Sequence, residues 1–138
     1  MQPTIALITI LTDDVPRLAA FYRDALGLAV KNDSGEYIEF ATQGVRFSVC
    51  ARTEMANITG DPGYSEPSRG HSFELAFPCA TPAEVDATYA TLVAKGARPI
   101  TAPADMPWGQ HTACFADPDG NIHEIFAEIT ANSPAETD

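Results

Sequence analysis

The chain has 138 residues, of which 45% are hydrophobic and 20% charged, a composition typical of one globular domain. Its 8 Lys and Arg residues and 19 Asp and Glu residues give a formal charge of −11. This charge disfavours nucleic acid as a partner and is compatible with a cationic or neutral ligand. The alternative is that the acidic residues only provide solubility. We expect no membrane span and no signal peptide, because the sequence lacks an apolar run of ~20 residues and a basic N-terminal segment. The three cysteines, Cys50, Cys79 and Cys114, are widely spaced, which predicts reduced thiols in a cytoplasmic protein.

The first part of the chain predicts a strand, a helix and a hairpin. Thr4–Leu11 is a short apolar, β-branched run that indicates a buried strand. Asp13 or Asp14 can cap a helix that Gly27 ends. The apolar residues at helical spacing are Val15, Leu18, Ala19, Tyr22 and Leu26. After a turn at residues 32–35, the runs Tyr37–Ala41 and Val45–Ala51 predict a hairpin.

Residues 52–70 are polar and contain three glycines and two prolines. We expect one long loop here, inside the domain, of the kind that is usually functional or mobile.

The pattern then starts again. Ser72–Phe77 alternates like a strand, Thr81-Pro82-Ala83-Glu84 is a capping box, and Gly96 ends the helix. The apolar stripe of this helix is Val85, Tyr89, Leu92 and Val93. The strands that follow are predicted over Ala97–Ile100, Thr112–Ala116 and Asn121–Ile129, with a tight turn at 117–120 and a frayed tail over 130–138.

Strand, helix and further strands therefore occur twice, and the two helix-ending glycines lie 69 residues apart. We predict an α+β fold made of two tandem βαβββ modules, about residues 4–51 and 71–129, in a single domain over 1–138.

Two groups of residues carry a family resemblance. The first is Asp14-Val15, the run AFYRD at 20–24 and LGL at 26–28; the second is WGQ at 108–110, DPDGN at 117–121 and Glu124. With these the chain resembles the vicinal-oxygen-chelate superfamily (glyoxalase, bleomycin resistance protein, dioxygenase) over residues 4–129. The WGQ and DPDGN pair and the stretch GHSFELAF at 70–77 are most similar to the bleomycin- and mitomycin-resistance branch, whose members sequester drugs and so give antibiotic resistance.

The resemblance implies that the two modules form half-barrels around a cleft, usually at a dimer interface, and hence a homodimer. It also implies four possible metal-ligand positions. They fall at Leu7, near Ser48, at Ser72 or Glu74, and at Glu124. Because Phe47 and Val49 should pack on the helix, Arg46, Ser48 and Cys50 should face the cleft. One firm carboxylate among four positions predicts no metal cofactor. The alternative is a divalent ion held by Glu124, Glu74 and His71, which requires a one-residue change of register.

Several of these residues also suit a ligand without a metal. Trp108, in a Pro-Trp-Gly loop, can stack on a planar compound or plug the module edge. Glu124 can bind a cationic group or pair with Arg46 across the sheet. His111 can line the cleft or lie on the surface, and His123 is expected to be structural. The predicted ligand-binding residues are Trp108, Glu124, Glu74, Arg46, Ser48, Leu7 and His111.

The function favoured by these observations is metal-independent sequestration of a planar or aromatic small molecule. The alternatives are a metal-dependent lyase, isomerase or dioxygenase, and an enzyme that uses acid–base chemistry at Glu124. No pair of nucleophile and base is legible in the sequence, so whether the chain is an enzyme stays open at this point. We expect a small-molecule ligand and no nucleic acid or membrane partner.

Overall fold

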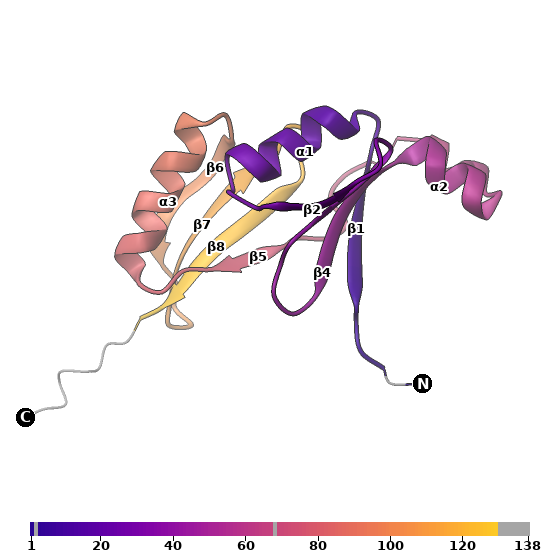
Figure 1. Ribbon diagram of the computed structural model, residues 1–138. Coiled ribbons are helices and arrows are strands. Elements are labelled where there is room, and N and C mark those ends of the chain that lie inside the picture. Colours follow the sequence, from indigo (N-terminus) through magenta and orange to yellow (C-terminus); the bar gives the residue numbers. More distant parts are fainter. Residues whose placement is uncertain (2, 68, 130–138) are drawn as a thin grey trace, which may run out of the picture. The chain divides into compact units, whose positions relative to one another are not determined.

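The computed structural model describes residues 1, 3–67 and 69–129. The chain divides into two compact units, the first ending at Gly70 and the second beginning at His71. Each unit holds one four-stranded mixed sheet and one helix packed on it (Figure 1). The predicted α+β fold of two βαβββ modules is therefore confirmed. No helix among the described residues is long and apolar enough to cross a membrane.

The first unit contains sheet A, with the strand order β1-β4-β3-β2. The pair β1 and β4 is parallel and the other pairs are antiparallel. Its elements are β1 (Leu7–Thr12), α1 (Val15–Asp24), β2 (Val30–Asp33), β3 (Tyr37–Phe40), β4 (Arg46–Ala51), α2 (Arg52–Thr59) and the 3₁₀ helix η1 (Pro62–Ser65).

Helix α1 begins and packs as its sequence predicts. The Asp14 carboxylate accepts a hydrogen bond from the Arg17 N–H at 3.1 Å and so caps the first turn. One face of the helix is buried on sheet A, where the Tyr22 ring meets Phe47 edge-on at 5.0 Å between centroids. Phe40 stacks on Phe47 at 5.6 Å, which gives the unit an aromatic core.

Two expectations for the first unit were wrong. Residues 52–70 are not one loop, because α2 and η1 occupy much of the segment. A run of good helix formers favours α2, and Gly60 ends it with φ of 75°, a conformation open to glycine at little cost. The strand β2 was also missed, since its sequence VKND has no apolar alternation and all its residues are exposed.

The second unit contains sheet B, with the strand order β5-β8-β7-β6 and a parallel pair β5 and β8. Its elements are β5 (Ala76–Pro78), α3 (Pro82–Ala94), β6 (Arg98–Asp105), β7 (Gln110–Ala116) and β8 (Ile122–Glu128). Strand β5 is shorter than the predicted Ser72–Phe77, and β6 runs five residues beyond the predicted end at Ile100. The predicted frayed tail over 130–138 lies outside the described residues.

His123 is a structural residue of this core, as expected. It is fully buried, and its Nδ1 accepts a hydrogen bond from the Leu75 N–H at 3.2 Å. Its Nε2 lies 3.6 Å from a carboxylate oxygen of Asp117. These contacts attach the segment before β5 to strand β8. Phe73, Phe77 and Phe115 surround the imidazole ring, and Phe73 is itself 45% exposed.

The cap of α3 allows a first test of the fold. The Thr81 hydroxyl accepts the Glu84 N–H at 3.1 Å, as predicted, and the Glu84 carboxylate reaches back to accept the Ala80 N–H at 2.6 Å, one residue before the N-cap position of a regular capping box. We predict that Thr81→Ala lowers the free energy of unfolding by about 1 kcal/mol, measured by urea denaturation. Thr91→Ala, an exposed change within the same helix, is the control; equal effects of the two changes would contradict the capping role.

Candidate functional site

Each sheet has one face covered by a helix and one face turned away from it. On sheet A the second face, called here the open face of sheet A, carries alternate residues of three strands. Strand pairing places them in rows: Leu7 beside Arg46, Thr9 beside Ser48 and Glu39, and Leu11 beside Cys50 and Tyr37. The alternation therefore places Arg46, Ser48 and Cys50 opposite the helix, as predicted, while Phe47 packs on α1.

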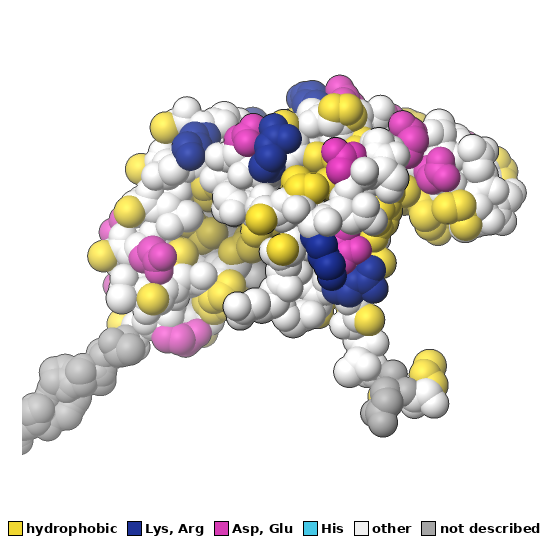
Figure 2. Space-filling model, viewed as in Figure 1, with side chains coloured by type: hydrophobic (Ala, Val, Ile, Leu, Met, Phe, Trp, Pro, Cys, Tyr) yellow, Lys and Arg dark blue, Asp and Glu magenta, His cyan; other side chains and the backbone are white. Residues whose placement is uncertain are grey.

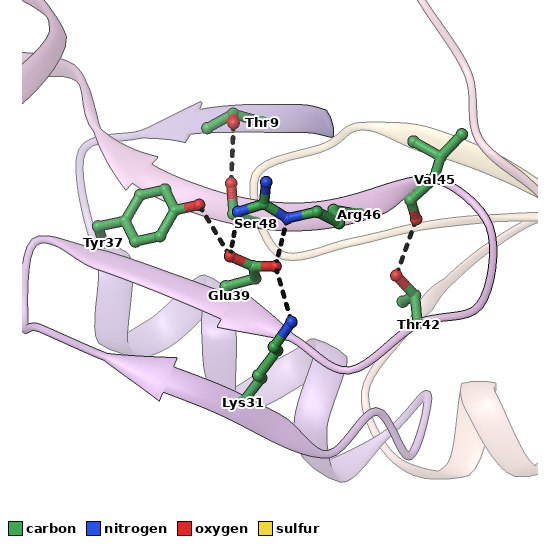
Figure 3. A network of polar contacts seen from close by, with 8 residues as sticks. All are labelled: Thr9, Lys31, Tyr37, Glu39, Thr42, Val45, Arg46 and Ser48. Atoms are coloured by element: carbon green, nitrogen blue, oxygen red, sulfur yellow. Dashed lines mark hydrogen bonds and ion pairs between the residues drawn. The ribbon is translucent and has the colours of Figure 1, made fainter. Parts of the chain in front are cut away.

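The centre of this face is an ion pair between Glu39 and Arg46 (Figure 3). The guanidinium donates from Nε and Nη2 to the two carboxylate oxygens, both at 2.8 Å. Lys31 Nζ lies 3.9 Å from the same carboxylate, and the Tyr37 hydroxyl donates to it at 3.3 Å. Glu39 is buried, with 4% of its surface exposed, whereas the side chains of Arg46 and Lys31 are 53% and 62% exposed.

This environment fixes the charge of Glu39. The hydrogen bonds from Arg46 lower its pKa to about 2, against the opposing effect of burial. The folded-state pKa is below the ordinary value, so the carboxylate stabilises the fold above about pH 4.5. This contribution is lost as the pH falls through about 2. At neutral pH the pair is fully ionised.

Sequence reasoning missed Glu39, which lies on the neighbouring strand and holds the guanidinium of Arg46. A signal was present in the sequence: Glu39 stands between Ile38 and Phe40, which both belong to the core. Alternation places such an acid on the face opposite the helix.

Hydroxyl groups complete the same face. The side-chain oxygens of Thr9 and Ser48 are 2.8 Å apart and share a hydrogen bond (Figure 3). Ser48 is fully buried, and Cys50 is also buried, which raises the pKa of its thiol. Leu7 is 37% exposed at the edge strand.

The corresponding face of sheet B is acidic. Its central row joins Ala76, Glu124 and Cys114 across three strands. Burial raises the pKa of Glu124, and the negative charge of Glu74 raises it further. Burial likewise raises the pKa of the Cys114 thiol, with Glu124 and Glu74 adding to the effect. A positive group brought to this face would relieve the repulsion between the two acids.

Trp108 lies at the tip of the hairpin between β6 and β7. Its indole is 65% exposed, so it is not a core residue. The indole Nε1 donates to the Gln110 side chain at 3.0 Å, and Gln110 donates in turn to Glu128 at 2.8 Å. Its polar edge is thus bound within the hairpin, while most of the apolar ring surface meets solvent.

His111 is on the helix side of sheet B. Its two ring nitrogens lie 2.7 Å from carboxylate oxygens of Asp105 and Asp86, and its side chain is only 14% exposed. These two bonds raise its pKa and connect the hairpin to α3. The expectation that His111 lines the ligand cleft finds no support in this geometry, because both nitrogens are already occupied.

The side chains at the four implied metal positions do not fit a metal centre. Leu7 has no donor atom, and the Ser48 hydroxyl is bound to Thr9. In the part of the chain that the structure describes, no three His, Cys, Asp or Glu side chains are grouped to hold an ion. A divalent ion requires several such ligands with supporting hydrogen bonds, and the side chains at these positions do not supply them.

Comparison with known proteins gives the family. Residues 4–125 match the model of the Glyoxalase/Bleomycin resistance protein/Dioxygenase superfamily, and the chain belongs to this superfamily. It is 32% identical over 123 residues to the uncharacterized protein YraH of Bacillus subtilis, covering 86% of this chain and 94% of YraH.

Solved structures agree with this assignment. A glyoxalase/bleomycin resistance protein/dioxygenase from Nocardioides superposes with a TM-score of 0.83 at 28% identity, covering 97% of this chain and 89% of the other. A lactoylglutathione lyase from Agrobacterium tumefaciens superposes with a TM-score of 0.72 at 23% identity, covering 92% and 95%. The second likeness shows a shared fold alone.

The His111 contacts predict a pH dependence of stability. The pKa of His111 is raised on folding, so the protonated imidazole stabilises the fold. This contribution to the free energy of unfolding is complete below about pH 6.5, the ordinary pKa of histidine. It is lost as the pH rises through the folded-state pKa. We predict that His111→Gln lowers the free energy of unfolding at pH 6 and has a smaller effect at pH 9. Urea denaturation at both values measures this; a difference between variant and parent that is independent of pH would contradict it.

Proposed function

We propose that this protein is a small-molecule-binding member of the superfamily that works without a metal and sequesters a planar or aromatic compound, as the drug-binding members do. We further propose that it acts as a cytoplasmic homodimer. Binding is assigned to the faces of sheets A and B that point away from the helices.

The observation that carries this proposal is the chemistry of the open face of sheet A. Two of the positions that the family resemblance marks as possible metal ligands are unsuited to that role. One holds the aliphatic Leu7, and the other holds Ser48, whose hydroxyl is hydrogen-bonded to Thr9. The carboxylate on this face, Glu39, is fully committed to Arg46. Such a face suits contact with a ligand better than coordination of an ion.

Sheet B supplies two features that favour an aromatic ligand with a positive or N–H-bearing group. The exposed indole of Trp108 offers a flat apolar surface whose polar edge is already bound. Glu124 and Glu74 repel each other on one face, which a cationic or hydrogen-bond-donating group would offset. Catalysis is not needed to explain these features.

Metal independence gives the first test of the proposal. We predict that the protein purified without chelator carries far less than one equivalent of Zn, Ni, Fe or Mn by elemental analysis, because Leu7 has no donor atom and the Ser48 hydroxyl is bound to Thr9. One equivalent of any of these metals, lost in Glu124→Ala, would overturn the proposal and favour a metal-dependent lyase, isomerase or dioxygenase.

Ligand binding gives the second test, because Trp108 is the sole tryptophan. We predict saturable quenching of its fluorescence by planar compounds, including cationic glycopeptide and quinone antibiotics. Trp108→Ala should weaken binding by roughly 1–3 kcal/mol, the value of a lost aromatic contact; because this variant has no tryptophan, calorimetry measures its binding.

Glu124→Gln should weaken cationic compounds more than neutral ones, because it removes the charge and keeps the shape. Glu66→Gln, which removes an exposed charge in the other unit, is the matched control. Failure of every compound to bind below millimolar concentration, or binding unchanged in Trp108→Ala, would refute the sequestration of an aromatic ligand.

The homodimer is tested by sedimentation equilibrium at micromolar concentration. We expect twice the mass of the chain, because the family resemblance implies a cleft at a dimer interface. A monomer alone would contradict this part of the proposal.

A further inference from the structure

We propose that the open face of sheet A contains a subsite for a monocarboxylate. In this subsite the Nη1 edge of Arg46 binds the carboxylate, Lys31 adds positive charge from the other side of Glu39, and the apolar body of the ligand lies over Leu7. The inference rests on the proposed function for the use of this face, and it names one chemical group that the ligand carries.

The Arg46 guanidinium has donors left after it binds Glu39. A guanidinium carries five N–H groups in a fixed plane. Nε and one N–H of Nη2 donate to Glu39, and the Tyr37 hydroxyl is a further hydrogen-bond partner of the guanidinium, so the donors that remain for a ligand are the two N–H groups of Nη1. Figure 3 shows Nη1 pointing away from Glu39. These two N–H groups can donate charge-assisted hydrogen bonds to a carboxylate.

The charge of the cluster favours a monoanion. Glu39 is ionised, so Glu39, Arg46 and Lys31 together carry one net positive charge in a chain of formal charge −11. On the surface seen in Figure 2, acidic side chains are spread over both units, and basic side chains gather in only a few places. A monocarboxylate would make the cluster neutral. A phosphate dianion would leave it negative within an acidic protein, which is less favourable.

A second arginine pair in the same unit shows what is particular to Arg46. On α1, Arg23 also donates from Nε and a terminal nitrogen to Asp24, at 2.7 and 2.9 Å. Both of those side chains are exposed, at 52% and 64%, whereas the Glu39 side chain is 6% exposed. A buried carboxylate is costly unless its partners compensate. Glu39 therefore serves to hold the guanidinium of Arg46 in one orientation, which the Arg23 pair does not achieve.

The neighbours of Arg46 indicate the rest of the ligand. Leu7 is its direct partner on β1, and cross-strand partners lie about 5 Å apart. Leu7 is 37% exposed. A carboxylate bound at Arg46 thus has apolar surface beside it, and the subsite suits an aryl or alkyl acid.

The test is an NMR titration of the ¹⁵N-labelled full-length protein with phenylacetate. The signals followed are the Arg46 Nε–H and the backbone amides of Leu7 and Ser48. We expect saturable shifts at these groups, and dissociation constants roughly tenfold higher for 2-phenylethanol and for inorganic phosphate. The alcohol keeps the ring without the charge, and phosphate keeps the charge without the ring.

Three variants locate the binding. Lys31→Gln removes an exposed charge with little risk to folding and should weaken phenylacetate several-fold. Arg46→Lys keeps the charge but removes the planar guanidinium and its fixed N–H donors, so binding should fall roughly tenfold. Arg23→Gln should leave binding unchanged. A native amide spectrum establishes that each variant is folded.

The subsite is overturned if phenylacetate causes no shifts at these groups, if phosphate binds equally well, or if neither Lys31→Gln nor Arg46→Lys weakens binding. Failure here is distinct from failure of the proposed function. If neutral planar compounds still quench Trp108 while phenylacetate does not bind, the sequestration proposal stands and the carboxylate subsite falls. If the protein instead carries a bound metal while phenylacetate still binds at Arg46, the carboxylate subsite stands and the sequestration proposal falls.

Discussion

The ion pair between Glu39 and Arg46 determines what the open face of sheet A can do. A carboxylate with 4% of its surface exposed is stable there only because two hydrogen bonds of 2.8 Å from the guanidinium offset the cost of burial. The pair removes Glu39 as a free ligand for a metal or a cation. It also fixes Arg46, whose outer edge remains half exposed. The binding chemistry proposed for this face follows from both consequences.

The two units share a topology but have opposite electrostatics on corresponding faces. The central row of sheet A is Thr9, Ser48 and Glu39, and that of sheet B is Ala76, Glu124 and Cys114. Each row contains one glutamate. The pKa of Glu39 is lowered by an arginine, while that of Glu124 is raised by burial and a second acid. One repeated fold thus offers one basic and one acidic face.

Much of this fold could be predicted from the sequence, because short-range rules control it. Helix caps at Asp14 and Thr81 and the alternation of Phe47 and Val49 in β4 are local signals, and the structure has them as expected. The strand β2 and the helix α2 were not predicted, since all residues of β2 are exposed and none of α2 is buried. The Arg46 partner was missed for another reason: the predicted hairpin sets the two strands side by side, but which residues face each other depends on the strand register, which periodicity does not reveal. His111 likewise depends on the approach of α3 to the hairpin.

The most direct test of this account is a ¹³C NMR titration of the side-chain carboxyl groups between pH 7 and pH 2. Glu39 and Glu124 report on the two faces in the same sample, so each serves as the control for the other. The account predicts that Glu39 remains ionised as the pH falls below 4, with a midpoint near its pKa of about 2, and that Glu124 titrates above the ordinary glutamate value of 4.5. Two midpoints that coincide at the ordinary value, or a Glu39 that takes up its proton before Glu124, would contradict it.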